Sequence, residues 1–193
     1  NINTDKFHES SASYSLDGKS VYFISDKPGG NGDRDIYVSN RDEKGKWSKA
    51  ENLGAVVNTE FGEEGVFMHP DGKTLYFSSQ GHNSIGGYDI FKTILDEKTK
   101  KWSTPENIGY PVNTTDDDVF YVVSANGKHG YYTSVNSNGF GGRDLYMISF
   151  IGEEKKEKPS EVKTEVVETK ADPVVKAIVS IPEPQPRLTI LKG

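Results

Sequence analysis

The sequence of 193 residues contains no cysteine, which excludes disulfide bonds, thiolate nucleophiles and cysteine-based zinc sites. Two other kinds of residue are missing from one end only. The two tryptophans, ten tyrosines and nine phenylalanines all lie at or before Phe150, and no glycine lies between Gly152 and Gly193. Residues 1–151 can therefore bury a core, whereas the rest of the chain has little with which to build one.

Long hydrophobic runs and basic clusters are also lacking. No apolar run approaches the roughly 20 residues that span a bilayer. The formal net charge is −6, and no group of lysines or arginines is interleaved with aromatic residues, which argues against nucleic acid as the main partner. The sequence has no G-x-S-x-G elbow, no P-loop and no histidine pair with metal-ligand spacing. We therefore predict a protein that is not an enzyme and has no catalytic residues, cofactor or metal.

What the chain does contain is an internal repeat with offsets of 54 and 55 residues. Each copy carries a hairpin signature, Asp-Gly-Lys or Asn-Gly-Lys, followed by a glycine-containing loop that ends in aspartate. The hairpin signatures begin at Asp17, Asp71 and Asn126. The loops, GDRDIY, GGYDIF and GGRDLY, end in the aspartates Asp35, Asp89 and Asp144. Such a period predicts a row of similar supersecondary units.

Each copy has the pattern of four short β-strands. In the second copy we predict strands at 65–69, 74–79, 89–95 and 102–108, because aromatic and β-branched residues fill these segments and turn residues separate them. Four antiparallel strands per unit are typical of a propeller blade. The predicted fold class is therefore an all-β propeller followed by an extended linker. The predicted repeat units are 8–61, 62–116 and 117–150.

The number of units falls short of a closed ring. Closed propellers typically have 4–8 blades, and the third unit lacks an adjoining fourth strand. Asn3-Thr4 matches Asn58-Thr59 and Asn113-Thr114 in the repeat, so the chain begins inside the repeat register. We expect further blades upstream of residue 1, and we expect that upstream segment to supply the missing strand of the third unit.

The Gly-Gly-x-Asp loop has two interpretations. The pairs Gly86-Gly87 and Gly141-Gly142 allow a tight turn into the third strand, whose first aspartate can accept backbone N–H bonds. A calcium site is the alternative, but each loop offers one repeated carboxylate, whereas calcium usually takes 6–8 oxygen ligands. We favour the structural role. The Asp-Gly and Asn-Gly pairs are expected to form type I′ turns, with positive φ at both central residues.

Two further segments are singled out by their composition. The acidic cluster Asp116–Asp118, matched by Glu63-Glu64 in the second unit, is expected to be a solvated loop; contact with a cation or a basic partner is the alternative. Residues 152–187 mix charges with five prolines, which predicts an interdomain linker. Its apolar run could bind a partner as an added strand or in a groove. The candidate contact residues there are Val174, Val175, Ile178, Val179 and Ile181.

Several motifs together resemble a known family. The segments PDGKTLYF (70–77) and GGYDIF (86–91) resemble the repeats of TolB-like, WD-repeat-like β-propellers. With WSTPENIGYPVNT (102–114), they look like the propeller of OmpA-family outer-membrane proteins of Bacteroidetes-type bacteria, including PorE-like components associated with type IX secretion and gliding. The resemblance covers residues 3–150. In that family a linker, a β-sandwich and a peptidoglycan-binding domain follow, which implies that residues 188–193 begin such a sandwich.

The resemblance also implies a function. A propeller of this family is a non-enzymatic scaffold in the periplasm, associated with the outer membrane without spanning it. Its expected partner is an outer-membrane protein or a secretion or gliding complex, and a downstream domain absent from this sequence would tether it to peptidoglycan. Two alternatives stay open. One is a glycan-binding or hydrolytic propeller whose chemistry lies on other blades, and the other is a calcium-dependent binding module.

Overall fold

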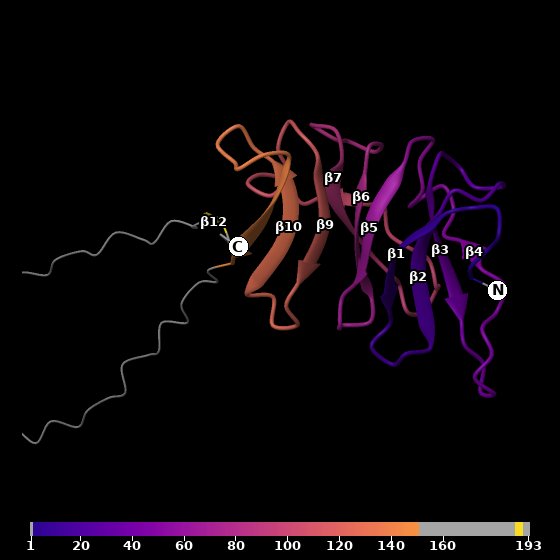
Figure 1. The fold of residues 1–193 in the computed structure, drawn as a ribbon. Coiled ribbons are helices and arrows are strands. Elements are labelled where there is room, and N and C mark those ends of the chain that lie inside the picture. Colours follow the sequence, from indigo (N-terminus) through magenta and orange to yellow (C-terminus); the bar gives the residue numbers. More distant parts are fainter. Residues whose placement is uncertain (1, 151–187, 191–193) are drawn as a thin grey trace, which may run out of the picture.

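The computed structural model describes residues 2–150 and 188–190, and all regular secondary structure there is β. The first sheet contains β1 (Glu9–Tyr14), β2 (Ser20–Ser25), β3 (Asp35–Asn40) and β4 (Glu51–Asn52). The second contains β5 (Glu63–Met68), β6 (Thr74–Ser79), β7 (Asp89–Ile94) and β8 (Glu106–Asn107). The third contains β9 (Asp118–Val123), β10 (His129–Val135), β11 (Arg143–Ser149) and β12 (Leu188–Ile190). The antiparallel sheets stand side by side as blades (Figure 1), which confirms the predicted all-β propeller fold.

In the second blade, the second and third strands agree closely with the prediction, whereas the first and fourth strands differ from it. The strand predicted at 74–79 is β6 without change, and β7 is one residue shorter than predicted. The first strand starts two residues earlier than expected, at Glu63. The predicted fourth strand is reduced to β8 and an isolated bridge between Leu95 and Trp102. The outermost strand of a blade is thus held by few ladder bonds.

The short strand β12 lies at the edge of the third blade. It pairs with β11 opposite Tyr146 and Met147. These positions match Tyr37 and Val38, against which β4 pairs in the first blade. The physical reason for the pairing is that β11 presents an open edge of backbone N–H and C=O groups, which any strand of the right register can pair with. That residues 188–193 begin a β-sandwich, and that an upstream segment supplies the fourth strand of the third unit, stay predictions.

The hairpins between the first two strands of each blade differ from the predicted turn. The positive φ angles lie at the glycines Gly18, Gly72 and Gly127 (66°, 75° and 67°) and not at the residues before them, so the type I′ prediction is wrong. In the second blade the N–H of Gly72 donates to the C=O of His69 at 3.0 Å. Asp71 is therefore the third residue of a turn that the glycine ends, and its carboxylate accepts the N–H of Lys73 at 2.9 Å.

Neighbouring blades pack face to face. Each blade has two faces. We call the face that contacts the following blade in the sequence the trailing face, and the face that contacts the preceding blade the leading face. At the first seam, Tyr22, Ile24 and Ile36 on the trailing face of the first blade meet Phe77 and Phe91 on the leading face of the second. All five side chains are buried, and burial of this kind is the dominant favourable term in folding.

The second seam repeats the first with larger aromatic residues. Ile90 and Tyr76 on the trailing face of the second blade pack against Tyr121, Tyr132 and Tyr146 of the third. The rings of Tyr76 and Tyr121 lie 5.1 Å apart between centroids. The stacked pair Tyr132–Tyr146, at 5.7 Å and 29°, has the geometry of the pair Phe77–Phe91, at 6.0 Å and 27°. The leading face is therefore built alike in these blades.

A buried asparagine from the linker completes each seam. Asn58 and Asn113 are 1% and 0% exposed. The Oδ1 of Asn58 accepts the N–H of Ile36 at 2.8 Å, and its Nδ2 donates to the C=O of the same residue at 3.0 Å. Asn113 makes both bonds to Ile90, each at 2.8 Å. The side-chain amide thus replaces a strand partner for a buried main-chain N–H, and it shares the C=O of the same residue with the N–H of Leu53 or Ile108.

Each linker asparagine also begins a polar chain within the blade. Its Nδ2 donates to a second asparagine on the fourth strand, and that residue donates to the aspartate of the glycine loop. In the second blade the bonds run from Asn113 to Asn107 at 2.7 Å and from Asn107 to Asp89 at 2.8 Å. In the first blade, Asn58 donates to Asn52 at 2.8 Å, and Asn52 donates to Asp35 at 3.2 Å.

We expect Asn113→Ala to lower the free energy of unfolding by about 2–4 kcal/mol, because it leaves the buried N–H of Ile90 without a partner and breaks the chain to Asn107. Urea unfolding followed by circular dichroism measures the loss. The exposed Asn40→Ala is the matched control and should change stability by less than about 1 kcal/mol. Equal losses in the two variants would contradict this role of Asn113.

Candidate interaction face

Two sets of loops meet at one end of the blades. One set is the linkers that lead into the first strand of a blade, and the other connects the second strand to the third. The N–H of Asp33 donates to the C=O of Phe61 at 3.2 Å, and the N–H of Gly87 donates to the C=O of Asp116 at 3.1 Å. We call this end the linker face; it forms the upper edge in Figure 1, opposite the Asp-Gly-Lys hairpins.

The repeated aspartates bind backbone groups of their own loops. Each carboxylate Oδ2 accepts an N–H from the residue four positions earlier. The donors to Asp35, Asp89 and Asp144 are Asn31, Ile85 and Phe140, at 2.6, 2.7 and 2.7 Å. Asp35 and Asp89 are buried, whereas Asp144 is half-buried, because no following blade covers it in this structure. The carboxylate holds a tight turn at the start of the third strand.

The first glycine of the motif lets the next linker approach. A Cβ atom at Gly86 would lie 2.5 Å from the carbonyl oxygens of Thr114 and Asp116, which is closer than such atoms can pack. Gly32 is in the same position in the first blade, where a Cβ would meet the carbonyl oxygen of Phe61. At Gly141 a Cβ would meet nothing within 4 Å. The motif glycine therefore serves the seam between blades.

Large apolar side chains gather on the linker face. Ile85 and Phe140 stand at matching places in the second and third blades, directly before the motif glycines, and are 58% and 69% exposed. Their main chains are the ones bound by the Asp89 and Asp144 carboxylates. Further exposed apolar residues on the same loops and linkers are Val56, Phe61 and Tyr110. The loop aspartates thus fix the main chain from which apolar side chains project outward.

Two acidic residues that were expected in solvated loops are buried. Glu63 and Asp118 are both 0% exposed, so that expectation is wrong for these two positions. The Oε1 of Glu63 accepts the hydroxyls of Thr59 and Ser79 at 2.8 and 2.9 Å. Asp118 accepts the N–H and the hydroxyl of Thr114 in the same way, at 2.6 and 3.0 Å. A threonine four residues before an acid, repeated in both linkers, was the sequence signal for this contact.

Burial controls the proton affinity of these acids. It raises the pKa of Glu63 to about 7, against the opposing effect of its hydroxyl and backbone donors, and the nearby Asp35 carboxylate adds to the increase. Burial likewise raises the pKa of Asp118, with Asp89 acting in the same direction. One oxygen of each acid, Oε2 of Glu63 and Oδ1 of Asp118, has no hydrogen-bond partner among the residues that the structure describes. The first strand of a blade thus starts at a poorly solvated carboxyl group.

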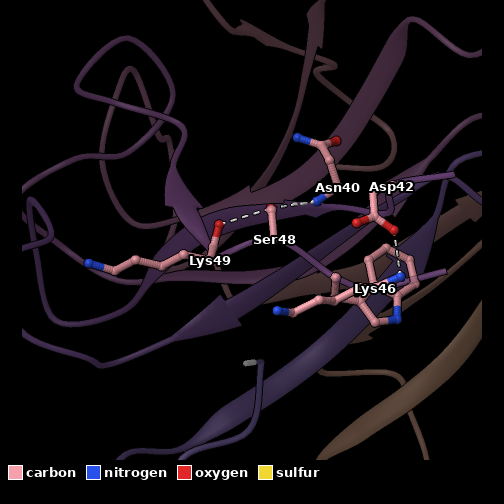
Figure 2. Close-up of a pocket in the computed structure, with 6 residues that line it drawn as sticks. Asn40, Asp42, Lys46, Ser48 and Lys49 are labelled. Atoms are coloured by element: carbon pink, nitrogen blue, oxygen red, sulfur yellow. Dashed lines mark hydrogen bonds between the residues drawn. The ribbon is translucent and has the colours of Figure 1, made fainter. Parts of the chain in front are cut away.

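Residues 2–150 hold no group of three or more histidines or acids that could bind a metal ion. A pocket at the turn between β3 and β4 is lined by Asn40, Asp42, Lys46, Ser48 and Lys49 (Figure 2). Its polar atoms stabilise the turn: the N–H of Lys46 donates to Asp42 at 2.8 Å, and that of Asn40 donates to Ser48 at 3.0 Å.

The remaining predicted site residues lie at the opposite end of the blades or outside the described residues. Asp17, Asp71 and Asn126 lie on the hairpins at the opposite end, where each side chain accepts a backbone N–H. The candidate contact residues between Val174 and Ile181 lie outside the described residues. Within the part of the chain that the structure describes, there is no helix with the length and hydropathy of a membrane span.

Comparison with solved structures identifies the fold. A TolB-type protein from Agrobacterium tumefaciens superposes with a TM-score of 0.51 at 22% identity, over 76% of this chain and 47% of its own. The fold is that of a TolB-like β-propeller. TolB from Acinetobacter baumannii has a TM-score of 0.48 at 18% identity, over 72% of this chain and 29% of its own. A prolyl endopeptidase has a TM-score of 0.42 at 20% identity, over 76% and 21%.

At sequence identities of 18% and 22%, the likeness of this chain to the two TolB structures shows a shared fold alone. No family model matches the chain, and no curated protein matches it either. The chain spans less than half the length of the two TolB structures.

The two motif glycines provide a matched pair for a stability test. Gly86→Ala should lower the free energy of unfolding by about 1–3 kcal/mol, because its Cβ would push the linker carbonyls of Thr114 and Asp116 away. Gly141→Ala, which has open space at the same motif position, should cost less than about 1 kcal/mol. Chemical denaturation of both variants measures the difference, and equal losses would show that the glycine does not serve the seam.

Glu63 should make the protein less stable as the pH rises. Its folded-state pKa of about 7 lies above the ordinary value of 4.5, so the folded state binds more protons than the unfolded state between these values. The free energy of unfolding should therefore fall by up to about 3 kcal/mol from pH 4.5 to 7.5. Glu63→Gln should remove most of that slope, and the exposed Glu60→Gln should keep it. A slope that survives Glu63→Gln would contradict the assignment.

Proposed function

We propose that this chain is part of a non-enzymatic interaction propeller in the periplasm. It would dock through its linker face onto an outer-membrane protein or a secretion or gliding complex. A separate downstream domain would tether the assembly to peptidoglycan. The observation that carries the docking proposal is the set of apolar side chains that project from one face, with Ile85 and Phe140 at matching places in two blades. The location and the tether rest on the sequence resemblance to OmpA-family propellers.

The linker face has the properties of a protein-binding surface. Isolated exposed apolar residues are ordinary in soluble proteins, but several on one face, presented by loops on a rigid scaffold, mark interaction sites. Aromatic residues such as Phe61, Tyr110 and Phe140 supply large contact areas at interfaces.

The loops of the linker face also favour binding because hydrogen bonds already order their main chain. Ordering mobile loops on association costs free energy, and this cost reduces affinity. Here the main chain at Ile85 is already bonded to Asp89, which is bonded in turn to Asn107. The apolar residue therefore projects from a loop that is tied to the fourth strand before any partner arrives. We expect little rearrangement of this face on binding.

Site-specific photo-crosslinking in the native cell envelope tests the docking face. A photoreactive residue at Ile85 or Phe140 should crosslink to an outer-membrane protein, and serine substitutions at both positions should reduce co-purification of that protein at least tenfold. The control is Leu16, a residue with 76% exposure on the hairpin at the opposite end. Equal crosslinking from Leu16, or crosslinks to soluble periplasmic proteins alone, would overturn the proposal.

A further inference from the structure

The linker face is negatively charged where the blades meet. It is formed there by four segments of loops and linkers, 26–34, 54–64, 80–88 and 109–117. We call these four segments the seam rim, and both seams lie between blades that the structure describes. The seam rim contains seven acidic residues and only two lysines or arginines, Lys27 and Arg34. Negative charge therefore predominates beside the apolar side chains of this face.

The arginines at the seam rim are neutralised within the chain. The Nη1 of Arg34 donates to the Oε2 of Glu64 at 2.5 Å, across the first seam. Arg143 reaches the rim from the start of β11, and its Nη2 donates to the Oδ2 of Asp117 at 2.7 Å. This hydrogen bond from Arg143 lowers the pKa of Asp117, so the pair stays ionised. Both arginines thus already have a carboxylate as their partner.

The lysine and the histidine of the seam rim are also bound by groups of the chain. The Nζ of Lys27 lies 3.7 Å from the centroid of the Tyr37 ring, which is a cation–π contact. The Nε2 of His82 lies 2.9 Å from the C=O of Val57. The groups on the rim that carry or can take up positive charge therefore stabilise the loops themselves.

Three carboxylates on the seam rim differ from these groups. Asp33, Glu60 and Asp116 are exposed, and their carboxylates have no hydrogen-bond or ion-pair partner among residues 2–150 and 188–190. Their main chains are nevertheless ordered. The N–H of Asp33 donates to the C=O of Phe61 at 3.2 Å, and the C=O of Asp116 accepts the N–H of Gly87 at 3.1 Å. Unpaired negative charge thus projects from fixed backbone at both seams.

Each seam places such a carboxylate next to an exposed apolar side chain. At the first seam, Glu60 directly precedes Phe61, which is 48% exposed and whose C=O binds Asp33. At the second seam, Ile85 is 58% exposed, and the loop that carries it is bonded to the main chain of Asp116. The two seams therefore repeat one combination, an apolar side chain beside an unpaired carboxylate.

We propose that the linker face binds a partner protein on which lysine or arginine side chains flank apolar ones. This inference rests on the proposed docking function and adds the chemistry of the partner. The partner's apolar side chains would pack on Phe61 and Ile85, and its cations would pair with Asp33, Glu60 and Asp116. Complementary charge of this kind speeds association and disfavours wrong partners. The same negative charge would repel a surface of anionic lipids.

Panning a displayed library of short random peptides against the 193-residue chain tests the partner's chemistry. Peptides that bind the chain but not a Phe61→Ser, Ile85→Ser double variant are binders of the linker face, and EDTA in the buffer excludes bridging by divalent cations. We expect lysine and arginine to be enriched about threefold or more in these peptides, next to apolar residues. Neutral or acidic linker-face peptides would overturn this inference and leave the docking face standing. A library without linker-face peptides would contradict the docking proposal itself.

Charge variants give a second measurement on the tightest such peptide. Its association rate should fall about tenfold between about 50 and 500 mM NaCl, because salt screens the attraction. Glu60→Gln combined with Asp116→Asn should lower that rate about threefold at low salt. The matched control is Glu43→Gln combined with Glu97→Gln, two exposed acids at the opposite end, which should change nothing. Circular dichroism checks that each variant is folded. Equal effects of the two pairs, or a rate independent of salt, would overturn the inference.

Discussion

Each seam between blades contains main-chain groups that no β-strand reaches. The N–H of Ile36 and that of Ile90 are buried at the outer side of the third strand, beyond the end of the two-residue fourth strand. Left unpaired in an apolar seam, such groups would cost several kcal/mol. The linker asparagines Asn58 and Asn113 satisfy them and at the same time fix where the chain crosses to the next blade. The packing of aromatic residues in the seams depends on this crossing point.

The linker asparagines also connect the seams to the surface. Through Asn107, Asn113 reaches Asp89, and Asp89 holds the loop from which Ile85 projects. One continuous set of hydrogen bonds therefore joins the interior of the stack to the linker face. A carboxylate that looks like a ligand in the isolated motif serves instead as the acceptor for this set. The proposed docking surface takes its rigidity from the same bonds that hold the blades together.

The same arrangement of linkers and blades also buries two acidic residues. Glu63 and Asp118 begin the innermost strands, and each is held by the threonine of the linker before it. Hydroxyl donors satisfy one oxygen of each acid, while the other is buried without a hydrogen-bond partner among the described residues. Burial raises the pKa of both carboxyl groups, since ionisation is costly where solvation is poor. The second and third blades therefore each begin at a buried carboxyl group whose pKa is raised.

Much of this molecule follows from local sequence. The period of 54 to 55 residues, the short strands and the glycine loops determine an all-β propeller, because turn residues and alternating apolar positions act within a few residues of each other. Tertiary structure alone decided the rest. The burial of Glu63, the open space over Gly141 and the pairing of Leu188–Ile190 with β11 depend on which blade, linker or edge lies beside each residue. Neighbours that are far apart in the chain set those environments; the local sequence signals only the threonine that binds Glu63 from four residues before it.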